Sequence, residues 1–204
     1  HLRGWIHLVA APLSLAASIV LTCLAPTGAT KGGSAIYLAA SLILFGISAL
    51  YHRFYWSPRW EIVWNRLDHS NIFLLIAGTY TPLSIAILPH DQAVTILSIV
   101  WGGALLGILL NLFWPTAPRW LATLIYVALG WVAVWYLPQF WALGGAVIVW
   151  LLLAGGILYT IGAVVYATKK PDLSPRWFGF HEIFHLCTVL AWACHCVAVY
   201  LAVL

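Results

Sequence analysis

Apolar residues occur along this chain in seven long runs, and short polar separators divide one run from the next. A helix of about 20 apolar residues crosses the roughly 30 Å hydrocarbon core of a bilayer. Strands of a membrane barrel would instead show segments of about 10 residues with alternating polarity, which these runs lack. The pattern predicts an all-α polytopic membrane protein with spans at residues 5–24, 35–55, 67–88, 93–113, 120–136, 143–167 and 179–204.

The composition supports this interpretation, because 64% of the 204 residues are hydrophobic and only 7% are charged. Such a chain exposes too much apolar surface to stay dispersed in water. The separators hold most of the charges and prolines, and none is long enough to form a soluble domain. We therefore expect residues 1–204 to form a single seven-helix transmembrane domain.

The basic residues indicate how the spans are oriented. If successive helices alternate in direction, Lys31 lies on one side of the membrane and the other cations lie on the side of the N-terminus. The positive-inside rule then places the N-terminus in the cytoplasm and the C-terminus outside. The cations are spread over several separators and form no block, which argues against nucleic acid binding. They are Arg3, Arg53, Arg59, Arg66, Arg119, Lys169, Lys170 and Arg176.

Four ionisable residues are predicted to meet at one depth of the membrane. His52 lies near the cytoplasmic end of the second span, with Ser48 one helical turn before it. Asp68 opens the third span on the same side, and His181 and His185 occupy the first turns of the seventh. Ionisable groups inside a bilayer cost about 2.5 to 3.5 kcal/mol each and are seldom kept without a partner. Their joint occurrence therefore indicates a functional site.

The spacing of the histidines predicts a metal centre. Residues four apart share one face of a helix, so His181 and His185 can bind one ion. His52 completes the three-imidazole set of a catalytic Zn²⁺ site, whose fourth position holds water. Three neutral ligands leave the charge of the ion uncompensated, which favours an ionised water and a nearby carboxylate such as Asp68. Metal binding on the order of 10 kcal/mol would offset the burial of these groups.

Simpler roles exist for the same residues. Any one histidine alone is more often a hydrogen-bonded or interfacial side chain than a ligand. Asp68 could cap the third helix, and Ser48 could bond a carbonyl oxygen one turn earlier. The segment His181-Glu182-Ile183-Phe184-His185 also matches the HExxH pattern of zinc proteases, in which Glu182 would be the general base. No third ligand follows nearby downstream, so the protease hypothesis is a minor alternative.

The remaining histidines are weaker candidates. His7 lies near the cytoplasmic end of the first span, and His69 is about 100° around its helix from Asp68. His195 lies ten residues beyond His185, about 15 Å deeper by helical rise, so it cannot share the same metal. A hydrogen bond within the bundle or a relay role both stay open for His195.

Four motifs in this order resemble the hemolysin III group of the progestin and adipoQ receptor family, which includes the adiponectin receptors. They are Ser48-Ala49-Leu50-Tyr51-His52, Leu67-Asp68-His69, Ile76-Ala77-Gly78-Thr79-Tyr80-Thr81-Pro82, and His181-x-x-Phe184-His185 with His195 ten positions on. The resemblance implies zinc held by His52, His181 and His185, with Asp68 and Ser48 close to the metal-bound water. It also implies kinship with alkaline ceramidases, and the short loops look like those of a bacterial plasma-membrane member.

The leading hypothesis is a zinc-dependent membrane hydrolase of lipid amide or ester bonds, linked to membrane lipid homeostasis. Asp68 would act as the general base and Ser48 would orient the water or Asp68. The membrane lipid would be the substrate or ligand, reaching the site sideways between helices. A second hypothesis is a non-catalytic, receptor-like regulator with a structural zinc between the second and seventh helices. A third is a membrane-permeabilising hemolysin, although so few pore-lining charges give it little physical support.

Overall fold

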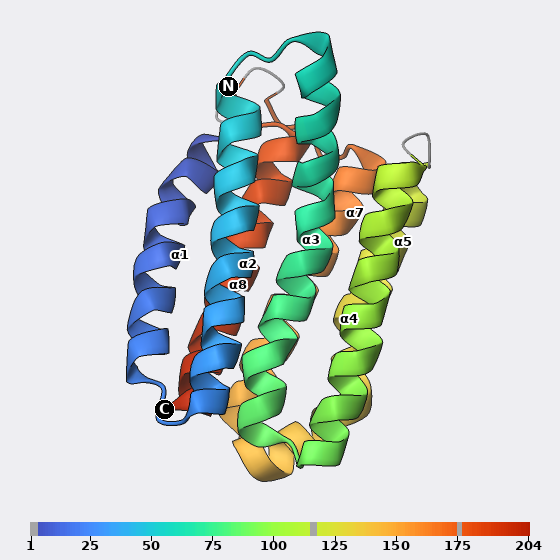
Figure 1. Cartoon of the computed structure of the whole chain (residues 1–204). Coiled ribbons are helices and arrows are strands. Elements are labelled where there is room, and N and C mark those ends of the chain that lie inside the picture. The colour runs from blue at the N-terminus through green and yellow to red at the C-terminus, as the bar shows by residue number, and fades with distance from the viewer. Residues whose placement is uncertain (1–3, 115–117, 175–176) are drawn as a thin grey trace.

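The computed structural model describes residues 4–114, 118–174 and 177–204, and these form a bundle of long helices (Figure 1). The fifth span, residues 120–144, joins several shorter helical pieces, so seven segments are long and apolar enough to cross a membrane. The described residues hold one isolated β-bridge, between Ser174 and Phe178. The predicted all-α, seven-span fold is confirmed. Its elements are α1 (Trp5–Leu24), α2 (Gly28–Arg53), α3 (Pro58–Ile87), α4 (His90–Phe113), α5 (Arg119–Gly130), η1 (Trp131–Tyr136), α6 (Leu137–Gln139), η2 (Phe140–Gly144), α7 (Ala146–Thr168) and α8 (Phe180–Val203).

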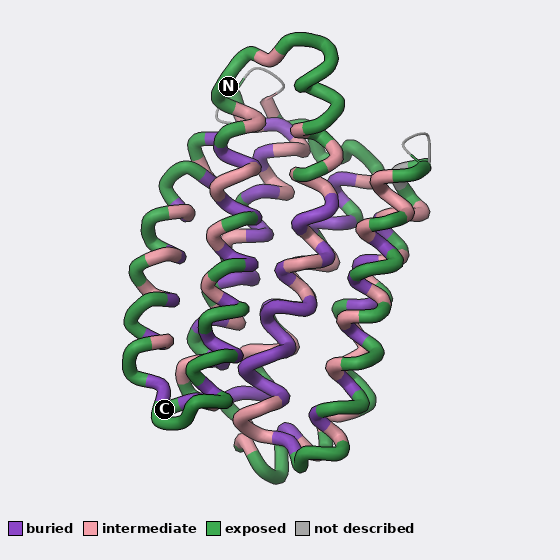
Figure 2. Tube along the Cα trace, in the orientation of Figure 1, coloured by how far each residue is buried: buried purple, intermediate pink, exposed green. Residues whose placement is uncertain are grey.

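The helices run up and down the bundle, and the two ends of the chain lie at opposite ends of it, as an odd number of spans requires (Figure 1). Helix α8 packs against α1, α3 and α7. It also reaches α2, because the Trp192 indole donates a hydrogen bond of 2.9 Å to the Ser41 hydroxyl. Buried positions lie on the inward faces of the helices and exposed ones on the outward faces (Figure 2). The exposed face carries apolar side chains such as Leu106, Val147 and Trp150, as expected of a surface in contact with lipid.

Two helices begin earlier than their apolar runs. Helix α2 begins at Gly28 because Thr27 and Thr30 form a reciprocal capping box. Helix α3 begins at Pro58, a residue whose fixed φ suits the first helical turn. The predicted separator at residues 56–66 is therefore mostly helix, and α3 extends beyond its neighbours (Figure 1). Hydropathy misses such extensions because their residues are polar or mixed.

The fifth span also departs from the prediction, since it continues as helix through residues 137–144. Its regular hydrogen bonding is interrupted where the Tyr80 side chain enters from α3. The Tyr80 hydroxyl donates to the Gly130 carbonyl oxygen at 2.6 Å and accepts from the Ala133 amide at 2.7 Å. A side chain inserted in this way replaces the normal backbone pairing, which explains the 3₁₀ turns of η1.

Small residues set the close helix contacts that position the site. At Gly78 of α3, an added Cβ would lie 2.5 Å from the Ala40 Cβ of α2, too near for any side chain. At Gly162 of α7, an added Cβ would lie 2.9 Å from the Cys187 Cβ of α8. Glycine lets two backbones approach closely within a membrane. These contacts hold α2 against α3, and α7 against α8.

Candidate metal centre

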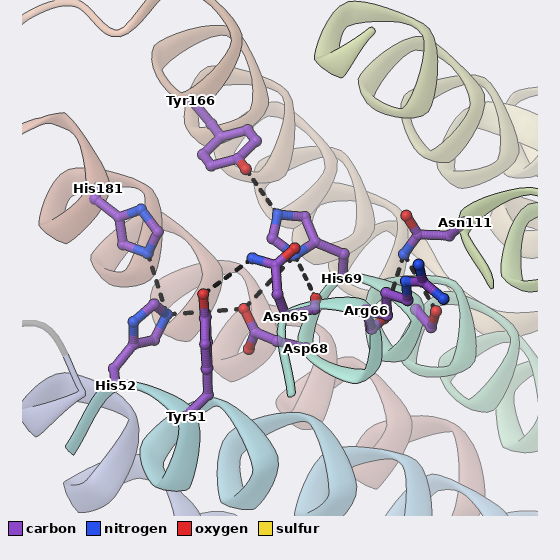
Figure 3. A network of polar contacts seen from close by, with 10 residues as sticks. Tyr51, His52, Asn65, Arg66, Asp68, His69, Asn111, Tyr166 and His181 are labelled. Atoms are coloured by element: carbon purple, nitrogen blue, oxygen red, sulfur yellow. Dashed lines mark hydrogen bonds and ion pairs between the residues drawn. The ribbon is translucent and has the colours of Figure 1, made fainter. Parts of the chain in front are cut away.

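Three histidines from two helices meet at one end of the bundle, and two of them, His52 and His181, are shown in Figure 3. His52 lies in the last turn of α2, whereas His181 and His185 lie in the first turns of α8. One ligand nitrogen from each can be chosen so that all three lie within 4.8 Å of one another. The structure therefore brings together the three residues predicted as ligands, and this cluster could bind a metal.

The spacing of one pair of nitrogens is compatible with a shared zinc ion. The Nε2 atoms of His52 and His181 are 3.2 Å apart. Zinc–nitrogen bonds of about 2.0 to 2.1 Å in a tetrahedron place neighbouring ligand atoms roughly 3.3 Å apart. Imidazole is also a donor that zinc prefers, and His185 is only 1% exposed, so the cluster is shielded from solvent on that side.

Asp68 lies beside the histidines but not at the start of its helix. Its Oδ2 is 3.7 Å from the His52 Nε2 and 3.9 Å from the His69 Nδ1. Its side chain is 13% exposed, and the buried Ser48 side chain lies against it from α2. Because α3 begins at Pro58, Asp68 cannot cap that helix. The carboxylate therefore lies next to the histidine cluster rather than at the end of a helix.

Glu182 has a different partner, although it lies between two of the histidines in sequence. Its carboxylate accepts a 3.0 Å hydrogen bond from the Gly179 backbone amide and so caps α8. The Phe180 amide, next in the chain, donates to Asp172 at 3.1 Å. A carboxylate at a helix N-terminus is favoured by the helix dipole. This arrangement supports a structural role for Glu182 and disfavours the protease hypothesis.

His69 lies in a hydrogen-bonded chain beside the site (Figure 3). Its Nδ1 is 2.8 Å from the Asn65 carbonyl oxygen, and its Nε2 is 2.7 Å from the Tyr166 hydroxyl. A carbonyl oxygen only accepts, so Nδ1 carries the hydrogen and Nε2 of the neutral ring accepts from Tyr166. This chain ties α3 to α7, and the Tyr166 ring also contacts His181 with centroids 6.0 Å apart.

His7 joins the site from α1, where the sequence alone gave it little weight. Its ring is stacked on that of His185, with centroids 3.9 Å apart and planes within 2° of parallel. The Phe45 ring packs edge-on against the His7 ring, with centroids 5.2 Å apart. His7 is 3% exposed. Gly4, with φ of 73°, lets the chain enter α1 close to His52, where a Cβ would come within 3.0 Å.

An apolar cavity begins one helical turn below these residues. Its wall includes Leu44, Ile72 and Thr188, which lie a turn deeper than Ser48, Asp68 and His185 respectively. The cavity continues between α3, the fifth span, α7 and α8. Its lining is predominantly hydrophobic, which suits a lipid chain rather than a polar ligand.

The fold and the site define a class: a seven-helix membrane protein with three convergent histidines at one end and an apolar cavity below them. Within that class, the chain belongs to the Haemolysin-III related family, whose model matches residues 1–196. Hemolysin-3 from Bacillus cereus is 35% identical over 188 residues, which cover 88% of this chain and 80% of that protein. The Hemolysin-3 homolog of Bacillus subtilis is 36% identical over 147 residues, covering 71% and 68% respectively.

A weaker similarity extends to animal receptors. The adiponectin receptor protein of Drosophila melanogaster is 28% identical over 176 residues, which cover 76% of this chain but 39% of the receptor. The progestin and adipoQ receptor-like protein 1 of Caenorhabditis elegans is 25% identical over 173 residues, covering 76% and 40%. The family predicted from the sequence motifs is thus confirmed.

Proposed function

We propose that this protein is a zinc-dependent membrane hydrolase that cleaves amide or ester bonds of lipids. The observation that carries this proposal is the position of the three histidines and Asp68 directly above an apolar cavity. A reacting carbonyl and a long hydrocarbon chain could then be held at once. A hydrolase of this kind would adjust the composition of the membrane in which it lies.

The histidines would hold the ion, which supplies a Lewis acid and an acidified water when bound. Asp68 would accept a proton at Oδ2 as the water oxygen bonds to the carbonyl carbon. The same carboxyl would return that proton to the leaving nitrogen or oxygen as its bond to the carbonyl carbon breaks. Ser48 would hold the Asp68 carboxylate by a hydrogen bond. The hydrogen bond from Tyr166 would fix the ring of His69, which follows Asp68 on α3.

A non-catalytic regulator is the second candidate, and one observation favours it. The contact between His52 and His181 joins the ends of α2 and α8, so a metal there would also clamp the bundle. The two candidates share their ligands and differ in whether a coordination position stays open for water. Membrane permeabilisation, suggested by the names of the relatives, has no comparable support in the site.

Measurement of lipid hydrolysis distinguishes the hydrolase from the non-catalytic regulator. The purified, zinc-loaded protein in nanodiscs is expected to hydrolyse at least one member of a panel of lipid amides and esters, with ceramides tested first. Removal of the metal by a chelator should abolish this activity, and added zinc should restore it. Products are measured by mass spectrometry. If the zinc-loaded protein turns over no lipid in the panel, the regulator becomes the better account.

The proposal also places the protein in a bacterial plasma membrane, with its metal site on the cytoplasmic side. Four cations lie at the metal-site end: Arg53 ends α2, Arg59 lies in the first turn of α3, and Lys169 and Lys170 follow α7. Lys31 lies in the first turn of α2, at the other end. Arg66 and the first residue of α5, Arg119, are also at the metal-site end by helix alternation. The predicted contributions of Arg3 and Arg176 fall outside the described residues.

A topology reporter tests this orientation. Alkaline phosphatase, which folds only outside the cytoplasm, is expected to be active when fused after Leu204, because the excess of cations retains the opposite end of the bundle inside. The matched fusion in the connection between α2 and α3 should be inactive. If the internal fusion is active and the terminal fusion is inactive, the protein has the opposite orientation in the membrane.

A further inference from the structure

Most polar groups in the wall of the cavity are already hydrogen-bonded within the protein. The three threonines donate to carbonyl oxygens one turn earlier in their own helices, at 2.8 to 2.9 Å. The other three bond to the backbone of the fifth span or to threonine hydroxyls. Such groups have little to offer a ligand. They are Thr79, Tyr80, Tyr126, Trp131, Thr160 and Thr188.

His195 is different, because its ring makes one hydrogen bond among the described residues and uses one of its two nitrogens for it. Its Nε2 is 3.1 Å from the Leu152 carbonyl oxygen of α7, so Nε2 carries the hydrogen. The edge of the ring that carries Nε2 packs against Gly155, where a Cβ would lie 2.3 Å from the ring. In the neutral ring Nδ1 is then a hydrogen-bond acceptor, and it lies on the edge away from Gly155. The ring itself lines the cavity.

Tyr159 adjoins His195 in the same wall. The two rings are 5.5 Å apart, at 60° to one another. The Tyr159 hydroxyl is buried and has no hydrogen-bond partner among the described residues. Burying a hydroxyl without a hydrogen-bond partner is unfavourable, so a ligand that supplies a partner would be favoured. The wall thus presents a donor and an acceptor side by side in otherwise apolar surroundings.

We propose that His195 and Tyr159 recognise a hydroxyl group carried part way along a lipid acyl chain. A hydroxyl can donate to the His195 Nδ1 and accept from the Tyr159 hydroxyl at once, whereas a ketone can only accept and a methylene group can do neither. This inference rests on the proposed function in one respect, namely that the carbonyl end of the lipid lies at the metal site. It deepens that function by naming the acyl chain selected.

The depth of the pair fixes where the hydroxyl lies on the chain. His195 is ten residues beyond His185, about 15 Å along α8, which matches an extended chain of roughly twelve carbon atoms. A hydroxyl near the middle of a long acyl chain would reach the pair. A hydroxyl next to the carbonyl would stay beside the metal site.

Binding of three fatty acids tests the inference. Octadecanoic acid, 12-hydroxyoctadecanoic acid and 3-hydroxyoctadecanoic acid are titrated into the purified protein in detergent and followed by calorimetry. The mid-chain hydroxy acid is expected to bind about tenfold more tightly than the unsubstituted acid, as one or two net hydrogen bonds would give. The 3-hydroxy acid should show no such gain.

Two variants test whether His195 and Tyr159 cause the preference for the mid-chain hydroxy acid. Tyr159→Phe removes a hydroxyl that has no protein partner, so the fold should be retained. His195→Leu removes the Nδ1 acceptor together with the hydrogen bond to Leu152, so its folding is checked by size-exclusion chromatography before binding is measured. Each variant is expected to reduce the tenfold preference to about twofold or less. Tyr126→Phe is the matched control, since that wall hydroxyl is engaged by Thr123 and its loss should leave the preference intact.

The outcomes separate this inference from the proposed function. Equal affinity of the wild type for all three acids would overturn the hydroxyl site, as would a preference that survives in both variants. Binding requires no turnover. A wild type that prefers the mid-chain hydroxy acid yet hydrolyses no lipid would sink the hydrolase proposal and leave the hydroxyl site in place.

Discussion

The double variant His181→Ala and His185→Ala is expected to lose nearly all bound zinc, whereas the wild type should carry about one zinc per chain. Two of three ligand nitrogens disappear, and the remaining imidazole of His52 cannot hold the ion alone. Apparent binding free energies of structural zinc are on the order of 10 kcal/mol, so the loss should be complete at ordinary concentrations. Metal content is measured by mass spectrometry on the purified protein in detergent.

His90→Ala is the matched control for this variant. His90 is the first residue of α4 and is exposed at the other end of the bundle, so its loss should leave the zinc content unchanged. Both proteins are first compared by size-exclusion chromatography and thermal unfolding, because His185 is buried and its truncation opens a small void. Full zinc content in a folded double variant would refute the ligand assignment.

The seven spans could be predicted because the bilayer imposes one strict requirement, a long apolar helix, and α1 begins and ends where its apolar run does. The meeting of His52 with His181 and His185 could be predicted for a related reason. Alternating spans bring the end of the second helix and the start of the seventh to the same depth. Neither inference needed knowledge of how side chains pack.

Other features depend on such packing, and the sequence gives little indication of them. The stacking of His7 on His185 arises from the approach of α1 to α8, and the bond between His69 and Tyr166 joins residues 97 positions apart. The 3₁₀ turns of the fifth span arise because Tyr80 enters from α3. Only the ionisable character of His7 and His69 inside an apolar run could have drawn attention to them.

Asp68→Asn is expected to retain folding and most zinc but to lose roughly 10² to 10⁴ in the rate of lipid hydrolysis. The amide keeps the shape of the carboxyl group and can still bond Ser48, but it cannot accept a proton from the attacking water. Asp68 lies 3.7 Å from the His52 Nε2, near enough for the carboxylate to reach a water held by the histidine cluster. Turnover is measured with the lipid found most active, alongside zinc content.

Asp91→Asn provides the comparison, because Asp91 is an exposed acidic residue in the first turn of α4, at the opposite end of the bundle. Its rate should equal that of the wild type. If Asp68→Asn also hydrolyses lipid at the wild-type rate, Asp68 takes no part in the reaction. If the zinc serves only as a clamp, no hydrolysis exists to lose, and Asp68→Asn should instead change the zinc affinity or the unfolding temperature. The pairing of turnover with metal content therefore distinguishes a carboxylate that moves a proton from one that merely neighbours a structural ion.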